Sequence, residues 1–258
     1  MAPGVKVIAR RGDSENAPEN TLPAFESAIA SGADGIELDV HQTADGQLIV
    51  HHFFNLGTTD NGTGLVGEKS LSELKALDSG AWFHARFSGI HKPQLAEVLE
   101  LCKGRIHLEI DMKHSSLDFL HRVIREVEDF GSTDQVELTT AHYPLLLYAK
   151  TRSPRIRTGT FFYEPPTWMP LRLAQQHALD WSSLLKIDMV HLNLALITPE
   201  FVEELHRRGF EAYGSNLDTE RDILRGIECG IDSFSTGHLR MALQTRDEAM
   251  NAARGGKS

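Results

Sequence analysis

Short β-rich segments alternate with longer amphipathic segments along most of this chain of 258 residues. The strand patterns cover Val5–Ala9, Gly35–Val40, Arg105–Met112, Gln135–Thr140, Arg157–Phe162, Met189–Leu192, Glu211–Gly214 and Asp232–Ser235. The helical patterns cover Thr21–Ser31, Leu117–Phe130, Tyr143–Thr151, Trp168–Trp181, Pro199–Arg208 and Thr219–Cys229. Eight strands with intervening helices indicate a parallel α/β barrel or a doubly wound sheet. A barrel of about 250 residues forms one domain, so we expect residues 1–258 to be a single domain.

The stretch between Asp39 and Pro93 breaks this alternation, because it contains no long helix. Its sequence HQTADGQLIVHH carries a hairpin signal at Asp45–Gly46. If these two residues form a two-residue loop, Asp39 lies directly opposite His52 on the same face. The second strand would then pass the barrel rim and fold back to place His52 at the mouth, where barrel active sites lie. We expect residues 42–92 to form a small cap insertion there.

Glu37 and Asp39 are two residues apart on a predicted strand, so both carboxylates project from one face. Such a pair at a barrel rim is unfavourable unless a cation or a proton neutralises it. An all-oxygen pair suits Mg²⁺ or Ca²⁺ better than zinc. The spacing alone is equally compatible with one inward carboxylate and one solvated neighbour.

A second strand, RIHLEIDMK, also places polar side chains on one face, at His107, Glu109, Asp111 and Lys113. A structural strand at this position would be apolar, so the pattern favours a functional role. Asp111 is the better candidate for a third metal ligand, and Glu109 is the alternative. Lys113 is predicted to provide a fixed positive charge for a phosphoryl oxygen.

The composition excludes several classes of partner. A net charge of −10 argues against broad nucleic-acid or membrane-surface binding. No stretch approaches 18 consecutive apolar residues, so we expect no stable membrane insertion. Only two cysteines are present and no signal peptide is evident, which indicates a cytoplasmic protein. The oligomeric state is not indicated.

The ordered motifs of the chain resemble those of the glycerophosphodiester phosphodiesterases. The opening IARRGDSENAPENTLPAFESAIASGADGIELDV is similar to the family's I-A-H-R-G, A-P-E-N-T and G-A-D-x-I-E-L-D-V motifs. The similarity continues through TADGQLIVHH, NGTGLV, LSELKALDSGAWF and KPQLAEVL. It is dense over about the first 115 residues and weaker, through GIDSFST, near the end. The resemblance implies a (β/α)₈ TIM barrel with a cap insertion after the second strand.

The resemblance also implies roles for individual residues. The ligands of a divalent metal ion, Mg²⁺ or Ca²⁺, correspond to Glu37, Asp39 and Asp111. The phosphate-binding side of the site corresponds to Arg11, Lys113 and Glu19. Of the family's two catalytic histidines, the second corresponds to His52 and the first is replaced by Arg10.

Further departures surround these positions. Phe53 stands where the family has an Asp, and Thr58 stands where it has an Arg. The family's Trp-Thr-Val-Asn is Ser215–Asp218 here, and its Thr-Asp near the last strand is Thr236–Gly237. Arginine remains protonated and is no ordinary general base, but Arg10 can stabilise a pentavalent phosphorane electrostatically.

The expected function is metal-dependent hydrolysis of a glycerophosphodiester or a related small phosphodiester, yielding a phosphomonoester and an alcohol. Two alternatives follow from the substitution at Arg10. The first is a catalytically impaired barrel that binds a phosphorylated ligand. The second is a specialised phosphosugar-diester hydrolase or cyclising lyase, in which Arg10 binds a second anionic group.

Overall fold

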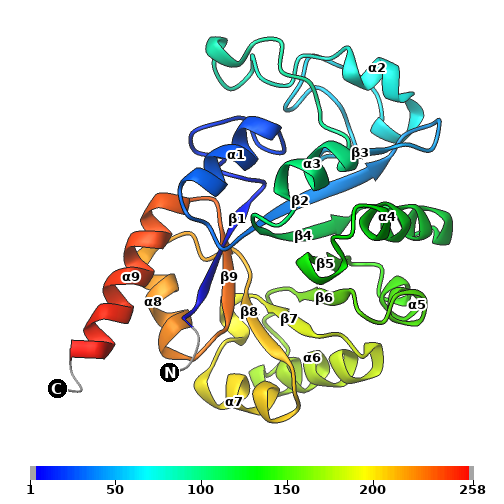
Figure 1. Ribbon diagram of the computed structural model, residues 1–258. Helices are drawn as coiled ribbons and strands as arrows, with labels where there is room; N and C mark the ends of the chain where they lie inside the picture. Colours follow the sequence, from blue (N-terminus) through cyan, green and yellow to red (C-terminus); the bar gives the residue numbers. More distant parts are fainter. Residues whose placement is uncertain (1–3, 256–258) are drawn as a thin grey trace.

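A closed parallel barrel forms the body of the molecule (Figure 1), and the computed structural model describes residues 4–255 of the chain. Within those residues, eight parallel strands follow the order β1-β9-β8-β7-β6-β5-β4-β2, and pairing of β1 with β2 closes the ring. They are β1 (Lys6–Arg10), β2 (Gly35–Gln42), β4 (His107–Met112), β5 (Val136–Thr139), β6 (Arg157–Phe162), β7 (Met189–Leu192), β8 (Glu211–Gly214) and β9 (Ser233–Thr236). The predicted (β/α)₈ barrel is confirmed.

Helices cover the outside of this barrel. They are α1 (Leu22–Ala30), α3 (Leu95–Cys102), α4 (Leu117–Asp129), α5 (Pro144–Arg152), α6 (Leu171–Leu185), α7 (Pro199–Arg207), α8 (Glu220–Glu228) and α9 (Leu239–Gly255). Short 3₁₀ turns η3 (Thr133–Gln135) and η4 (Leu194–Leu196) lie between them. The sequence patterns missed α3, a helix of about two turns. Its N-cap residue, Gln94, is not one of the residue types that usually mark the start of a helix. The sequence patterns also missed α9, whose inward positions include the small residues Ala242 and Thr245.

The main hydrophobic core lies between the sheet and the helices. In β4 the side chains of Leu108, Ile110 and Met112 are buried in this outer layer. The alternating Glu109 and Asp111 line the cavity inside the barrel. The interior of the barrel therefore contains the carboxylates, together with a small separate cluster of Ile8, Met189 and Tyr213, while the main apolar packing lies outside the ring of strands.

The segment between β2 and α3 forms a cap beyond the end of β2 (Figure 1). It contains β3 (Leu48–Val50), η1 (Val66–Glu68), α2 (Leu71–Lys75) and η2 (Ala85–Phe87). A small hydrophobic cluster of its own is formed by Ile49, Leu56, Val66 and Leu74. None of the described helices is long and apolar enough to cross a bilayer.

The hairpin that begins the cap differs from the predicted one by a single residue. The backbone N–H of Thr43 donates to the carbonyl of Gln47 at 2.9 Å, so three residues separate the strands. The last of them, Gly46, has a φ of 78°, the left-handed conformation that glycine adopts without steric cost. The predicted pairing of Asp39 with His52 is therefore wrong.

His51 takes the place opposite Asp39, and its backbone N–H donates to the Asp39 carbonyl at 3.0 Å. The side chain of His51 is buried in the cap, with Nε2 3.4 Å from the carbonyl of Asn55. Because β3 ends at Val50, its strand alternation does not extend to His52. His52 consequently reaches the cavity of the barrel although the predicted register is wrong.

A buried ion pair joins the middle of the cap to its C-terminal end. The ammonium of Lys92 donates to Asp60 Oδ2 at 2.7 Å and to Ser79 Oγ at 3.1 Å. The other oxygen of Asp60 accepts backbone N–H groups of Gly57 and Gly62 at 2.9 and 2.8 Å. The Lys92 and Asp60 side chains are almost completely inaccessible to solvent.

Replacing Lys92 with Met is expected to destabilise the protein by about 3–5 kcal/mol, because it leaves the Asp60 carboxylate buried without its counterion. Urea-induced unfolding measures this loss. Lys75→Met is the matched control, since the Lys75–Glu97 pair is partly exposed and such pairs contribute about 0–1 kcal/mol. Equal losses in the two variants would contradict a special role for the buried pair.

Candidate active site

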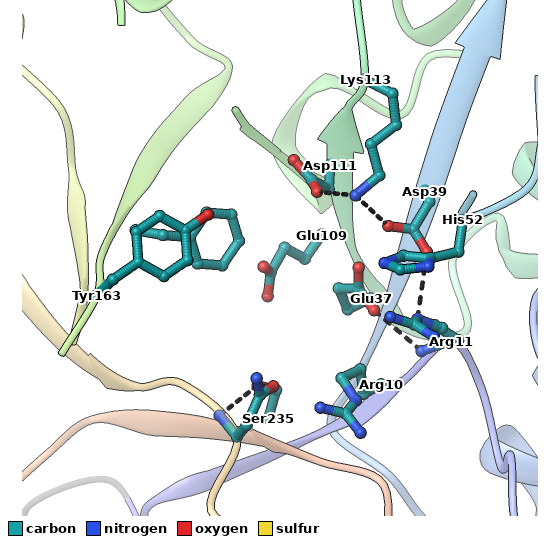
Figure 2. A pocket seen from close by; sticks show the side chains of 12 residues that line it. Arg10, Arg11, Glu37, Asp39, His52, Glu109, Asp111, Lys113, Tyr163 and Ser235 are labelled. Carbon is teal, nitrogen blue, oxygen red and sulfur yellow. Dashed lines mark hydrogen bonds and ion pairs between the residues drawn. The ribbon is translucent and has the colours of Figure 1, made fainter. Parts of the chain in front are cut away.

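A cavity of about 180 Å³ opens among the carboxyl ends of the barrel strands (Figure 2). It is lined by Arg10, Arg11, Glu37, Asp39, His52, Glu109, Asp111, Lys113, Phe161, Tyr163, Asn216 and Ser235. Seven of the eight predicted site residues are in this set, and the exception is Glu19. The carboxyl ends of barrel strands are where barrel enzymes place their active sites.

The turn after β1 positions the carboxylates of β2. Arg11 adopts a left-handed backbone conformation with a φ of 57°, and its N–H donates to the Glu37 carbonyl at 2.8 Å and to Glu37 Oε2 at 3.0 Å. Asn20 donates its side-chain amide to Asp39 Oδ2 at 2.7 Å. The turn therefore fixes both carboxylates through hydrogen bonds rather than leaving them to repel each other.

Glu19 lies behind this turn and contacts Arg11 instead of the cavity. Nη1 of Arg11 donates to both carboxylate oxygens of Glu19 at 3.1 Å. A carboxylate repels a phosphate, so the contact that Glu19 makes orients the guanidinium of Arg11. Any effect of Glu19 on an anion in the cavity would pass through Arg11, which differs from the direct role that we predicted.

Three carboxylates converge at the end of β2 and β4. Ligand oxygens of Glu37, Asp39 and Asp111 lie within 4.8 Å of one another, and Asp39 and Asp111 are register partners. Burial, with repulsion from Asp39, raises the pKa of Glu37 to about 8. This all-oxygen set with excess negative charge fits a hard divalent cation such as Mg²⁺ or Ca²⁺.

The alternative ligand, Glu109, is outside this group of three. Its Oε2 accepts the hydroxyl of Tyr213 at 2.6 Å inside the barrel. Burial and the neighbouring Glu137 raise the pKa of Glu109 well above its ordinary value. Because Glu109 lies outside the group of three and one of its oxygens accepts the Tyr213 hydroxyl, the geometry favours Asp111 over Glu109.

Lys113 lies at the edge of the carboxylate group, where its ammonium contacts two acids (Figure 2). Its Nζ is 2.7 Å from Asp39 Oδ1 and donates a short hydrogen bond to Asp111. Although burial opposes it, this ammonium helps to keep the pKa of Asp39 below its usual value. Lys113 is therefore a permanent cation beside the group that would hold a metal.

His52 faces the same cavity from the base of the cap. Burial lowers the pKa of His52 to about 4, and the nearby Asp39 opposes this shift only in part. Its Nδ1 is buried and makes no hydrogen bond among the described residues. The ring of Phe53 packs edge-on at a centroid distance of 4.6 Å. His52 is thus neutral at pH 7 and able to accept a proton.

The floor and one wall of the cavity contain residues that sequence reasoning did not assign. His191 is fully buried, with Nε2 2.8 Å from Glu137 Oε1, and its ring stacks on Tyr213 at 4.0 Å. Phe161 and Tyr163 stack with each other along the wall. The polar residues His191 and Glu137 at inward strand positions could have been predicted from the sequence, because a buried strand is otherwise apolar. The wall residues carry no such signal.

Arg10 occupies the side of the cavity next to Ser235, away from Lys113 (Figure 2). Its Nη2 lies 3.8 Å from Asp218 Oδ2. Of the other departures from the family pattern, Gly237 lies beside Arg10, whereas Thr58 is exposed in the cap. Arg10, whose strand pairs with Glu37, therefore forms one group of altered positions with Asp218 and Gly237, whereas Phe53 lies beside His52.

Comparison with known proteins identifies one family. A sequence profile of the glycerophosphoryl diester phosphodiesterase family matches residues 11–240. The chain is 33% identical over 237 residues to a glycerophosphodiester phosphodiesterase from Caldanaerobacter subterraneus subsp. tengcongensis, covering 89% of this chain and 93% of the relative. A glycerophosphodiester phosphodiesterase from Agrobacterium tumefaciens superimposes with a TM-score of 0.79 at 26% identity, over 93% of this chain and 99% of the other. A phosphodiesterase from Oleispira antarctica, solved with the product sn-glycerol-3-phosphate, gives a TM-score of 0.84 at 24% identity, over 95% and 97% of the chains.

Proposed function

Because the chain belongs to the glycerophosphoryl diester phosphodiesterase family, a family of phosphoric diester hydrolases, we propose that it hydrolyses a small glycerophosphodiester. The products are a phosphomonoester and an alcohol. The convergence of Glu37, Asp39 and Asp111 beside His52 is the observation that carries this proposal. The sn-glycerol-3-phosphate bound to the Oleispira antarctica phosphodiesterase supports a product of the same kind here.

A divalent cation, Mg²⁺ or Ca²⁺, would be held by Glu37, Asp39 and Asp111. When bound, such a cation neutralises charge on the phosphoryl oxygens and lowers the pKa of a coordinated water. Support comes from the all-oxygen donors and from the burial of Glu37, which, together with repulsion from Asp39, raises its pKa to about 8 and makes a neighbouring cation favourable.

The chain's own residues supply the remaining functions. Lys113 and Arg11 are permanent cations at the cavity that stabilise the negatively charged phosphoryl group. His52 is neutral and lines the cavity, so it is the residue that moves a proton at an oxygen of the reacting phosphate. Phosphorus NMR of a reaction with glycerophosphocholine and Mg²⁺ or Ca²⁺ tests this proposal. Release of sn-glycerol-3-phosphate supports hydrolysis, whereas a cyclic phosphate would indicate a lyase.

A catalytically impaired phosphate-binding barrel is the second candidate, and Arg10 is the observation that favours it. A guanidinium stays charged at accessible pH and takes no part in ordinary proton transfer. The retained carboxylates, Arg11 and Lys113 would still bind a phosphorylated ligand. In this case the chain would bind sn-glycerol-3-phosphate in the presence of metal without turning over any diester.

Arg10→His separates the two candidates. If the cavity is an impaired form of a two-histidine site, the variant should gain about 10²–10⁴-fold in turnover of glycerophosphocholine, the typical contribution of one acid–base group. If the cavity is adapted to a reaction that uses Arg10, the variant should gain nothing. Steady-state kinetics with saturating metal measures the difference, and Arg122→His on the exposed face of α4 is the matched control.

A further inference from the structure

The guanidinium of Arg10 is an unused hydrogen-bond donor in a cavity whose other cations are engaged. Lys113 contacts Asp39 and Asp111, and Arg11 donates to Glu19. The side chain of Arg10 makes no hydrogen bond within the part of the chain that the structure describes. It is 31% exposed and faces the cavity. An arginine offers five N–H donors in a planar fork, which suits a carboxylate or phosphate.

Two neighbours give this guanidinium a defined place. Asp218 lies 3.8 Å away, but one oxygen of its carboxylate accepts the Thr236 hydroxyl at 3.0 Å and the Gly237 N–H at 2.8 Å. A Cβ on Gly237 would lie 3.2 Å from Nη2 of Arg10. The absence of a side chain at Gly237 thus makes room for the arginine, and Asp218 draws it to that side of the cavity.

The surroundings of Arg10 are polar and complete a small subsite. Ser235 Oγ lies 3.2 Å from the backbone N–H of Asn216 and 3.3 Å from its Oδ1. The side-chain nitrogen of Asn216 makes no hydrogen bond among the described residues. Asn216 lines the same cavity, and Figure 2 shows Arg10 and Ser235 at the side away from Lys113 and Asp111. Arg10 is the register partner of Glu37 and lines the same cavity, so it lies next to the place where the carboxylates would anchor a ligand.

We propose that Arg10 binds a second anionic group of the diester, a carboxylate or phosphate on the alcohol beyond the scissile phosphate. The inference rests on the proposed hydrolase function and names its substrate class: a diester whose substituent is negatively charged. Asp218 and Gly237 act as positioning residues for Arg10. Asn216 supplies a further N–H donor to the same group.

Two matched pairs of diesters test the proposal. Glycerophosphoserine differs from glycerophosphoethanolamine by one carboxylate, and glycerophosphoglycerol 3-phosphate differs from glycerophosphoglycerol by one phosphate. For at least one pair, the wild type should favour the anionic member by about 10- to 100-fold in kcat/KM, the range expected for charge-assisted hydrogen bonds. The preference should reside mainly in KM, because the contact is made before and during the reaction alike.

Two variants assign this preference to Arg10. Arg10→Gln should reduce the preference for the anionic diester to about 2-fold or less. It should lower kcat/KM for the anionic member alone, because only that member loses a contact with a charged group. Gly237→Ala changes no charge and places a Cβ 3.2 Å from Nη2 of Arg10, so it should shift the guanidinium slightly and reduce the preference by less than Arg10→Gln does. Arg122→Gln, an exposed substitution on α4, should leave it unchanged.

Equal losses for both members of each pair in Arg10→Gln would overturn the proposal, since Arg10 would then act on the scissile phosphate. Absence of any preference in the wild type would overturn it too. If the wild type cleaves no diester, the proposed hydrolase function is wrong. The subsite is then tested separately by calorimetry, which compares the affinities for O-phosphoserine and O-phosphoethanolamine in the presence of Mg²⁺. Tighter binding of O-phosphoserine that disappears in Arg10→Gln supports the subsite, and equal binding overturns it.

Discussion

Simultaneous replacement of Glu37 by Gln and Asp39 by Asn is expected to abolish diester cleavage. The two substitutions keep the shape of the side chains and remove two of the three negative charges that would hold the cation. A remaining single carboxylate, Asp111, is also engaged by Lys113. Since metal-dependent charge neutralisation contributes several kcal/mol to such a reaction, we expect a loss of about 10³-fold or more.

Calorimetry with Mg²⁺ and with Ca²⁺ should show the loss of binding in the same variant. Thermal unfolding supplies a second measure, because a metal that binds only the folded state raises its stability. Asp118→Asn, which changes an exposed carboxylate on α4, is the control. Retention of turnover on every diester tested in the Glu37 and Asp39 double variant would refute the metal site and the metal dependence of the proposed reaction.

The single substitution Glu37→Gln checks that loss of activity does not reflect unfolding. The folded-state pKa of Glu37, about 8, lies above its ordinary value of 4.5, so protonation stabilises the folded state. Without metal, the wild type should therefore lose stability as the pH rises from about 4.5 through 8. Glu37→Gln resembles the protonated form, so its melting temperature should decline less over this range; the decline that remains comes from other buried acids whose pKa is raised, such as Glu126.

The second large effect is expected for His52→Gln, which should lower kcat by about 10²–10⁴-fold while metal binding is retained. His52 contacts the cavity but is not one of the three carboxylates that would hold the cation. Glutamine preserves much of its size and polarity but cannot accept a proton at neutral pH. Steady-state kinetic assays at a saturating metal concentration measure kcat.

His121→Gln on the surface of α4 is the matched control for this substitution. If kcat of His52→Gln stays within about twofold of the wild-type value, the change in activation free energy is well below the roughly 1.4 kcal/mol of a tenfold effect. Such a result would show that another group transfers the proton. A parallel loss of metal affinity would instead indicate that His52 acts through the geometry of the carboxylates. The two readouts together separate proton transfer from positioning.

Much of this fold was predictable because each barrel strand is a short apolar segment bounded by polar turns. The positions of β6, β7 and β8 match the predicted ranges. The hairpin after β2 was not predicted correctly, because the turn signal at Gly46 is compatible with loops of two or three residues. One residue of loop length decides which of His51 and His52 lies opposite Asp39.

The site was predictable where polar residues interrupt an apolar pattern, as Glu37, Asp39 and Asp111 do. The contact between Glu19 and Arg11 was not, because it depends on the left-handed backbone of Arg11 and not on residue spacing. The grouping of Arg10 with Asp218 and Gly237 likewise joins segments more than 200 residues apart in the chain. Such a meeting follows from closure of the barrel through β1 and β9.

The buried pair between Lys92 and Asp60 has a consequence for the way in which this enzyme would fail under stress. His52 belongs to the cap that this pair closes, whereas the three carboxylates belong to barrel strands. Segments with few buried contacts open at lower free energy than the rest of a domain. Partial opening of the cap would therefore give a molecule that still captures metal but has lost its proton acceptor, so inactivation would precede loss of the cation.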